Sequence, residues 1–407
     1  MKCRACKNDL NISFVKLGTS PPSNSYLIKE NLKTPEKWFP LSVNVCSNCW
    51  LAQTEDFNEA DELFDENYAY FSSFSSSWLK HAEKFSNYAI KKFNLNSNSK
   101  VIEIAANDGY LLQYFKNKKV PCLGIEPTKS TANAAREKGI EILEEFFSVK
   151  LARKLSNEGK HSDLMIANNV LAHVPDINDF VSGFEELLNP QGIASFEFPH
   201  LMNLVKFNQF DTIYHEHFSY LSLSAVNIIF SNNGLQIFDV EEISTHGGSL
   251  RIFAQKKKTG IYKTNENFNK LLNLEEKLGM TNKAFYEGFQ NKVDKIKNDF
   301  LSLLIKIKSQ NKTVIGYGAA AKGNTIINYS GVKEDLIKFI VDKNPNKQNK
   351  FMPGSRIPIL PEASIKELKP DFIIIFPWNL KKEIEAQLSY TKEWGCQFIT
   401  LIPKVNL

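Results

Sequence analysis

Four of the six cysteines in this chain form two Cys-x-x-Cys pairs, and each pair can present two thiolates from one turn. Four thiolates are a complete tetrahedral set for zinc, with sulfur–zinc distances of about 2.3 Å and no position left for water. We therefore expect a structural zinc ion (Zn²⁺) rather than a catalytic one. The pairs lie farther apart than in a compact zinc ribbon, which predicts a small subdomain between them. The predicted ligands are Cys3, Cys6, Cys46 and Cys49.

A second group of reactive side chains lies in the segment Tyr214 to Tyr220, which contains two imidazoles, one carboxylate and two phenols. Imidazole is well suited to proton transfer near neutral pH. Such a set can remove a proton beside a carbonyl and stabilise the enolate oxygen, which produces a nucleophilic carbon. We expect His217 to be the base, Glu216 to orient it or to stabilise the imidazolium, and Tyr214 or His173 to donate to the enolate. A second metal site is the alternative, although His-x-His with one acid is an incomplete zinc pattern.

Residues 101–112 have the pattern of a buried strand, a turn of small and polar residues, and the start of a helix. Ligands of α/β folds lie beyond the carboxyl ends of the strands, where a glycine allows the backbone to approach closely. This turn lacks the spaced glycines that hold a pyrophosphate, which favours a cofactor without one. The candidate cofactor contacts here are Glu103, Ala105, Asn107, Asp108 and Gly109.

Two further strands should deliver polar side chains to the same edge of the sheet. The next strand ends at Glu126, where a carboxylate can accept hydrogen bonds from ribose hydroxyls, and the strand from residue 163 ends at Asn168 and Asn169. These three elements together resemble the S-adenosyl-L-methionine-binding elements of class I methyltransferases. A nicotinamide enzyme is the alternative, and the missing glycines count against it.

The elements that position these residues divide the chain into five predicted parts. Strand-like and helix-like segments alternate from residue 100 to 256 and again from residue 311, which predicts two α/β units with mainly parallel sheets. The second should be a smaller Rossmann-like domain. We expect a zinc-binding module at 1–65, a linker and lead-in helix at 66–99, a methyltransferase domain at 100–256, a helical connector at 257–310 and a C-terminal domain at 311–407.

Composition narrows the class of protein. A net charge of +5 from 50 basic and 45 acidic residues is small for 407 residues, so nucleic acid is not expected as a main ligand. No apolar run is long enough to cross a bilayer, and the N-terminus lacks the apolar core of a signal peptide. The cysteine usage fits a reducing compartment. We expect a cytoplasmic protein with no membrane partner.

With these motifs in view, nearly the whole chain resembles the zinc-containing sugar C-methyltransferases of deoxysugar biosynthesis. Besides the cysteine pairs, the cofactor turn and the Tyr214 to Tyr220 segment, the resemblance rests on YxYFSS from Tyr68, NVLAHVPD from Asn169, HGGSLR from His246 and GYGAAAKGNT from Gly316. That family acts on nucleotide-linked 4-keto sugars, typically at C-3. The resemblance implies active-site roles for Tyr214, Glu216, His217, His173 and either Tyr68 or Tyr70.

The resemblance also implies that the C-terminal unit holds a nucleotide sugar. A glycine-rich turn between a strand and a helix offers backbone N–H groups and a lysine to a pyrophosphate. A vestigial turn kept for packing is the alternative. Asp342, after the next strand, could meet a ribose. The candidate substrate-binding residues are His246, Arg251, Gly316, Gly318, Lys322 and Asn324.

Two other functions compete with a methyltransferase. The C-terminal glycine turn, taken alone, predicts an NAD(P)-dependent nucleotide-sugar reductase. The cysteines and mild positive charge, taken alone, predict a zinc-ribbon protein that binds RNA or protein without catalysis. The sequence leaves open the nucleotide (dTDP, GDP, CDP or UDP), the sugar, the carbon methylated, and the oligomeric state, with a monomer among the options.

Overall fold

The computed structural model describes residues 1–55 and 71–406, which form three sheets arranged along the chain. The first is a four-stranded antiparallel sheet in the order β1-β2-β3-β9. Three of its strands come from the N-terminal module and the fourth comes from the middle of the chain. Its strands are β1 (Ile12–Ser20), β2 (Phe39–Val45), β3 (Ala52–Thr54) and β9 (Ser219–Tyr220), with the short helix η1 (Lys29–Lys33) between β1 and β2.

The second sheet has seven strands in the order β10-β11-β8-β7-β4-β5-β6. All neighbours from β8 to β6 run parallel, and β11 runs antiparallel to both of its neighbours. The strands are β4 (Val101–Ile104), β5 (Cys122–Ile125), β6 (Glu141–Leu143), β7 (Ser162–Asn168), β8 (Leu188–Pro199), β10 (Leu235–Ile243) and β11 (Ser249–Lys256).

Helices cover both faces of this sheet. Successive side chains of a strand point to opposite faces, so a strand that is apolar throughout must be covered on both. Leu164 and Ile166 of β7 pack with α2 and α3, whereas Met165 and Ala167 pack with α5, α6 and α8. The helices are α2 (Ser76–Lys92), α3 (Leu112–Asn117), α4 (Lys129–Glu137), α5 (Val149–Asn157), α6 (Ile177–Leu187), α7 (Leu201–Lys206), α8 (Leu223–Asn232) and α9 (Glu266–Lys277).

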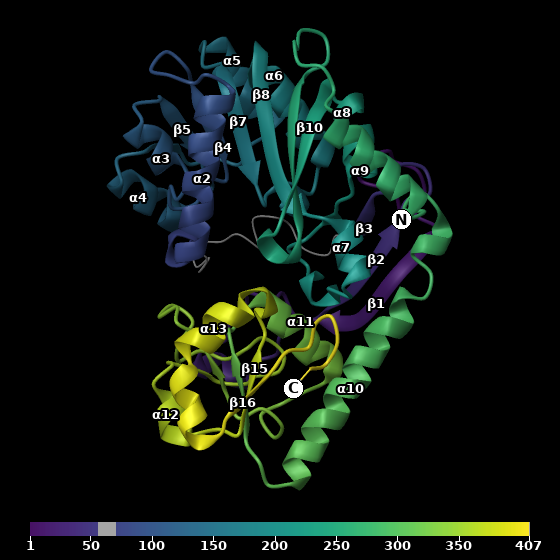
Figure 1. Cartoon of the computed structure of the whole chain (residues 1–407), viewed down its shortest axis with the longest axis vertical. Coiled ribbons are helices and arrows are strands. Elements are labelled where there is room, and N and C mark those ends of the chain that lie inside the picture. Colours follow the sequence, from purple (N-terminus) through teal and green to yellow (C-terminus); the bar gives the residue numbers. More distant parts are fainter. Residues whose placement is uncertain (56–70, 407) are drawn as a thin grey trace.

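The third sheet is parallel, in the order β14-β13-β12-β15-β16, and belongs to the C-terminal domain. The long helix α10 (Phe289–Ser309) runs beside the molecule from the middle domain to this domain (Figure 1). The remaining elements are β12 (Val314–Tyr317), α11 (Ala321–Ser330), β13 (Ile340–Val341), β14 (Ile359–Leu360), α12 (Ser364–Leu368), β15 (Phe372–Ile375), α13 (Lys381–Gln387) and β16 (Gln397–Ile399).

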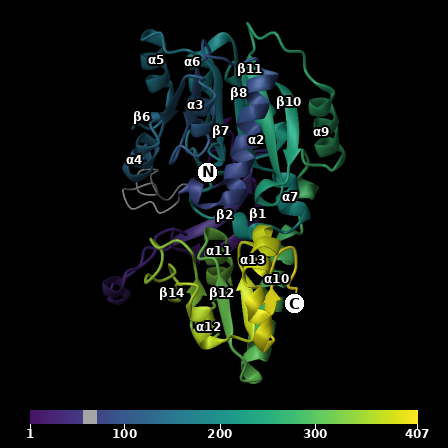
Figure 2. The same cartoon turned by 60° about the vertical axis from the view of Figure 1, so that its left-hand side comes forward.

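Strands β1 and β2 lie between the two larger sheets (Figures 1 and 2). Their apolar side chains share one core with α10 and with buried residues of the C-terminal domain. The N-terminal module is therefore packed against both α/β units. Within the described ranges, 1–55 and 71–406, no helix has the length and apolar character to cross a membrane.

Candidate active site

The turn after β4 has the tight backbone that a bound cofactor requires. Ala105, Asn107 and Gly109 all adopt left-handed conformations, with φ of 54°, 49° and 74°. A Cβ atom on Gly109 would lie 2.4 Å from the Cδ1 atom of Ile140, so a side chain there would require Ile140 to move. Left-handed backbone costs a non-glycine residue about 1 kcal/mol, which the surrounding structure must support.

Glu126 holds this turn from the neighbouring strand. It directly follows β5, and its Oε2 atom accepts a hydrogen bond from the Asn107 backbone N–H at 2.8 Å. The Oε1 atom accepts from the Thr128 backbone N–H at 2.9 Å. A carboxylate offers about four lone-pair sites, so two remain for ligand hydroxyls. Burial raises the pKa of Glu126.

Several buried polar atoms at this edge lack hydrogen-bond partners within the part of the chain that the structure describes. They are Glu103 Oε2, Asp108 Oδ1, Asn168 Oδ1, and both amide atoms of Asn169. Buried polar groups in native proteins are nearly always paired, so this cluster calls for a polar ligand. The donor and acceptor set fits the amino-acid and nucleoside groups of S-adenosylmethionine. Glu103 itself is 1% exposed, and burial raises its pKa well above the usual range.

The segment before α2 packs on the cofactor turn. The backbone N–H of Ser72 donates to Asn107 Oδ1 at 2.9 Å, and that of Ser73 donates to Asp108 Oδ2 at 3.2 Å. The Lys138 ammonium donates to the Ser73 hydroxyl at 2.8 Å and to the Asp108 carbonyl at 2.6 Å, and no sequence motif predicts these contacts. The two tyrosines expected in the active site, Tyr68 and Tyr70, lie outside the described residues.

His217 is held in one tautomer by its neighbours. Its Nδ1–H donates to the Thr212 carbonyl at 2.9 Å, because a carbonyl can only accept. The neutral ring therefore has its lone pair on Nε2, which accepts from the Tyr214 hydroxyl at 3.0 Å. Burial lowers the pKa of His217 well below its usual value, and the nearby positive charges that His173 and Lys322 can carry add to this effect. The ring is thus a neutral base.

The hydrogen bonds of Glu216 and His173 differ from the simplest arrangement for the roles expected of them. Glu216 does not orient His217: its Oε1 atom accepts from the backbone and side-chain amides of Asn24, both at 3.2 Å. The turn from Tyr214 to His217 points these adjacent side chains in different directions, and the Thr212 carbonyl orients His217 instead. His173 Nδ1–H donates to the Glu216 carbonyl at 2.6 Å, so the neutral ring has no second N–H for an enolate. Burial lowers its pKa to about 4.

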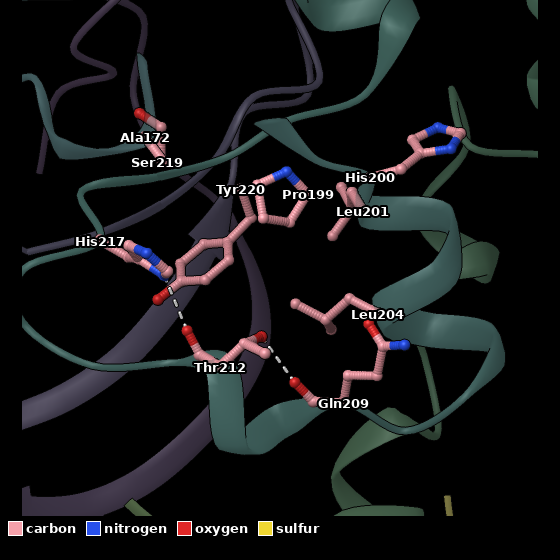
Figure 3. A pocket seen from close by; sticks show the side chains of 10 residues that line it. All are labelled: Ala172, Pro199, His200, Leu201, Leu204, Gln209, Thr212, His217, Ser219 and Tyr220. Atoms are coloured by element: carbon pink, nitrogen blue, oxygen red, sulfur yellow. Dashed lines mark hydrogen bonds between the residues drawn. The ribbon is translucent and has the colours of Figure 1, made fainter. Parts of the chain in front are cut away.

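A small cavity lies behind His217, between Thr212, Ser219 and Tyr220 (Figure 3). Its volume of about 20 Å³ accommodates roughly one water molecule. Figure 3 shows the Tyr220 hydroxyl beside His217, with the His217 to Thr212 bond drawn as a dashed line. This cavity is too small for a ligand much larger than water.

The C-terminal domain reaches the same region through Lys322. The Nζ atom lies 4.4 Å from the ring centre of Trp378 and donates to Asn379 Oδ1 at 2.9 Å. The Trp378 indole in turn donates to Asp211 Oδ2 at 2.7 Å, one residue before the carbonyl that orients His217. Burial raises the pKa of Asp211 to about 6, and the Lys322 charge opposes this rise. Neither Asp211 nor Trp378 lies in a recognisable motif, so the sequence alone does not identify them.

Two further candidate substrate-binding residues, His246 and Arg251, lie in different surroundings. His246 packs on Trp78, with 5.2 Å between ring centres, and burial lowers its pKa to about 4. Arg251 is 6% exposed, and its guanidinium pairs with Glu197 at 3.0 Å and Glu241 at 3.2 Å. These partners hold the guanidinium inside the domain.

In the C-terminal turn, Gly316 lies in β12 and Gly318 adopts a φ of 88°. Asn324, in the first turns of α11, is fully buried, and neither atom of its side-chain amide has a partner among the described residues. The turn therefore has the left-handed glycine and the polar side chain expected of a ligand-binding loop.

The four predicted zinc ligands lie together in the N-terminal module, with all four sulfur atoms within 4.8 Å of one another. The Sγ atoms of Cys3 and Cys49 are 3.5 Å apart, and those of Cys6 and Cys46 are 3.4 Å apart. Tetrahedral zinc with bonds of about 2.3 Å requires sulfur separations of roughly 3.8 Å, so the set fits the ion. The Gln53 amide donates to the Cys3 sulfur at 3.2 Å, as a thiolate ligand favours.

The zinc module also holds the segment from Tyr214 to Tyr220. Strand β3, which begins three residues after Cys49, pairs with β9, which begins two residues after His217. The Thr54 hydroxyl donates to the His217 carbonyl at 3.1 Å, and the Thr54 N–H donates to the Phe218 carbonyl at 3.1 Å. The metal site therefore supports the position of the His217 segment as well as the fold of its own module.

Comparison with known families gives three adjacent matches along the chain. Residues 3–64 match a family described as "Putative zinc binding domain", residues 78–240 match "Methyltransferase domain", and residues 244–403 match "C-methyltransferase C-terminal domain". C-methyltransferase NovU from Streptomyces niveus is 31% identical over 403 residues, which covers 99% of this chain and 96% of NovU.

Solved structures resemble parts of the chain. Magnesium protoporphyrin IX methyltransferase (ChlM) from Synechocystis PCC 6803, with bound S-adenosylmethionine, is 15% identical, with a TM-score of 0.34 over 44% of this chain and 79% of ChlM. The PH0226 protein from Pyrococcus horikoshii OT3 is 17% identical, with a TM-score of 0.39 over 49% of this chain and 100% of that protein. With the family matches, the observed sheets confirm the predicted class I methyltransferase fold, N-terminal zinc module and second Rossmann-like domain.

Proposed function

Because the chain belongs to the zinc-containing, S-adenosylmethionine-dependent C-methyltransferase family that includes NovU, we propose that its acceptor is a nucleotide-linked keto-deoxysugar methylated at C-3, beside a 4-keto group. The observation that carries this proposal is the fixed tautomer of His217, which places the basic lone pair on Nε2, beside the Tyr214 hydroxyl. Oxygen methylation would not need a proton removed from carbon.

The proposed reaction begins when His217 Nε2 takes the proton from the carbon beside the ketone. The electrons of that C–H bond form an enolate, whose oxygen takes the negative charge. S-adenosylmethionine supplies an electrophilic methyl group, and the enolate carbon forms a bond to it as the carbon–sulfur bond breaks. The Tyr214 hydroxyl, which donates to Nε2 in this structure, can donate to the enolate oxygen once His217 is protonated.

Residues from three parts of the chain support this chemistry. Glu126 and the cofactor turn would hold the nucleoside of the methyl donor. The Gly318 turn would bind the pyrophosphate of the acceptor, with the Lys322 ammonium between that turn and the acid–base cluster. Half-buried Lys322 also favours neutral His217, because two nearby positive charges repel each other.

The test combines a substrate screen with a proton-exchange assay. Nucleotide-linked 4-keto sugars are incubated with S-adenosylmethionine, and a product heavier by one methyl group is identified by mass spectrometry. The active acceptor is then incubated in D₂O without the methyl donor. We expect His217→Gln to lose both methylation and deuterium incorporation, by about 10²-fold or more. His215→Gln is the matched control, because His215 Nε2 faces the Pro40 carbonyl of the zinc module.

Three outcomes would overturn the proposal. Methylation on oxygen would exclude the enolate. Deuterium incorporation at the wild-type rate in His217→Gln would show that His217 is not the base. Conversion of none of the nucleotide-linked keto sugars, while a simple ketone or free sugar is methylated, would reject the substrate class.

A further inference from the structure

The Thr212 carbonyl, which fixes the tautomer of His217, belongs to a segment that contacts the C-terminal domain. Thr212 is the last residue of the short helix η4 (Phe210–Thr212). Its carbonyl accepts a hydrogen bond from the His217 Nδ1–H at 2.9 Å. The residues immediately before and after Thr212, Asp211 and Ile213, each accept a hydrogen bond from the C-terminal domain. The carbonyl that orients His217 is therefore bracketed by two contacts between domains.

The two donors come from different elements of the C-terminal domain. The Trp378 indole, three residues after the end of β15, donates to Asp211 Oδ2 at 2.7 Å. The Thr325 hydroxyl, in the second turn of α11, donates to the Ile213 carbonyl at 2.8 Å. Helix α11 follows β12, and β12 and β15 are parallel neighbours, so the segments after both strands lie at the same edge of the sheet. One edge of the sheet thus supplies both donors.

The contact between α11 and η4 is closed to solvent. Thr325 is 2% exposed, and Ile213 is fully buried. The Phe210 and Tyr329 rings of the same two helices lie 6.1 Å apart between centres. Removing a donor from a buried carbonyl leaves the cost of its lost hydration unpaid, so the backbone moves toward another donor. The Thr325 bond therefore restrains the backbone on one side of Thr212.

A shift of the Thr212 carbonyl would change His217 in a specific way. A neutral imidazole carries its proton on one nitrogen only, and the bond to Thr212 selects Nδ1. If that bond weakens, the tautomer with the proton on Nε2 becomes accessible, because its Nε2–H can donate to the Tyr214 hydroxyl. In that tautomer Nε2 has no lone pair to receive a proton. The position of one carbonyl thus decides how much of His217 is in the basic form at Nε2.

We propose that Thr325 and Trp378 are positioning residues for His217: they hold the Thr212 carbonyl where it keeps the lone pair of the base on Nε2. This inference rests on the proposed role of His217. It gives the C-terminal domain a part in proton removal besides the proposed binding of the acceptor. The competing explanation is that these two hydrogen bonds only fasten the domains together. In that case their loss lowers stability and leaves His217 unchanged.

Three variants of the full, zinc-loaded chain separate the two explanations. Thr325→Val removes the hydroxyl with little change in shape, and Thr325→Ser keeps the hydroxyl and should behave as the wild type. The matched control is Thr391→Val, because the Thr391 hydroxyl is also buried and donates to a carbonyl of its own domain, that of Leu388, at 2.8 Å. The thermal midpoint should fall in both valine variants, since each loses one buried hydrogen bond.

The first measurement is the tautomer of His217 in the full chain without ligands. The NMR signals of ¹⁵N-labelled histidine report which ring nitrogen carries the proton, and the signals missing from His217→Gln identify this ring. The wild type, Thr325→Ser and Thr391→Val should show the proton on Nδ1. Thr325→Val should show a second population with the proton on Nε2. A role in fastening the domains alone would not produce this population.

The second measurement is deuterium incorporation, in D₂O without the methyl donor, into the nucleotide-linked 4-keto sugar that the enzyme methylates. Thr325→Val should slow the exchange about tenfold, the effect of one lost buried hydrogen bond. Thr325→Ser and Thr391→Val should stay within about twofold of the wild-type rate. The affinity of Thr325→Val for S-adenosylhomocysteine, measured by calorimetry, should be unchanged, because Glu126 holds the cofactor turn from within the middle domain.

Each outcome decides between the explanations. If Thr325→Val keeps a single tautomer with the proton on Nδ1, or exchanges deuterium at the wild-type rate, this inference is wrong while the proposed function stands. If Thr391→Val slows the exchange as much as Thr325→Val, the effect is one of stability and the inference fails. If His217→Gln exchanges at the wild-type rate, the proposed function fails as well. If Thr325→Val does not fold, Trp378→Phe removes the other donor and is measured in the same way.

Discussion

Protonation of the partly buried His173 makes the free energy of unfolding depend on pH. Burial lowers its pKa to about 4, whereas the unfolded chain titrates near 6.5. The folded protein therefore keeps this ring neutral at pH values where the unfolded chain binds a proton. The stability that results is fully present above pH 6.5 and is lost as the pH falls toward 4.

The magnitude follows from the shift. At pH 5 a site with these two values contributes about 2 kcal/mol less to the free energy of unfolding than at pH 7.5. This figure is an upper bound, because part of the ring is exposed to solvent. Other buried groups titrate in the same range: the pKa of His246 is lowered to about 4 and that of Asp211 is raised to about 6. The total pH dependence therefore cannot be assigned to His173 alone.

A comparison of variants isolates the His173 contribution. His173→Gln and His173→Phe remove the titrating ring, and urea denaturation at pH 7.5 and pH 5 gives the free energy of unfolding of each. At pH 7.5 both should be less stable than the wild type, because the bond to the Glu216 carbonyl is changed or lost. At pH 5 this deficit should shrink by up to about 2 kcal/mol in both variants. A deficit that stays the same, or grows, at pH 5 refutes a neutral His173 in the folded state.

Three further predictions concern separate parts of the molecule. Glu126→Gln should weaken binding of S-adenosylmethionine by about tenfold or more, since a charged acceptor is lost beside the turn; calorimetry showing unchanged affinity contradicts this. Removing zinc with a chelator should abolish methylation and increase hydrogen exchange in β3 and β9, because β3 of the zinc module pairs with β9. If zinc is lost while exchange protection and activity stay intact, the zinc module does not support the His217 segment. Trp378→Phe should lower kcat with a smaller change in KM for S-adenosylmethionine, because the indole hydrogen bond to Asp211 near His217 is lost. Equal kinetics for the wild type and Trp378→Phe would show that this hydrogen bond does not support catalysis.

Much of the framework follows from local sequence patterns. The four cysteines identify a zinc site because Cys-x-x-Cys turns create paired ligands without help from the rest of the fold. The cofactor turn and Glu126 can be located because strand ends and small-residue turns are local features, and parallel strands bring their carboxyl ends to one edge. The strand pattern likewise predicts both α/β units, since fully buried strands are apolar on both faces.

The roles of individual side chains depend on contacts between distant segments. Glu216 and His217 are adjacent in the sequence, yet their side chains bond to different partners. Asn24 of the N-terminal module donates to Glu216, whereas His217 donates to the Thr212 carbonyl, because the chain turns between the two residues. The partner that sets the His217 tautomer is a backbone carbonyl, which every residue possesses and no motif records. Arg251 lies in a motif, yet its guanidinium pairs with the buried Glu197. Residue type and spacing therefore determine which chemistry is available, whereas packing between segments decides which atoms face each other.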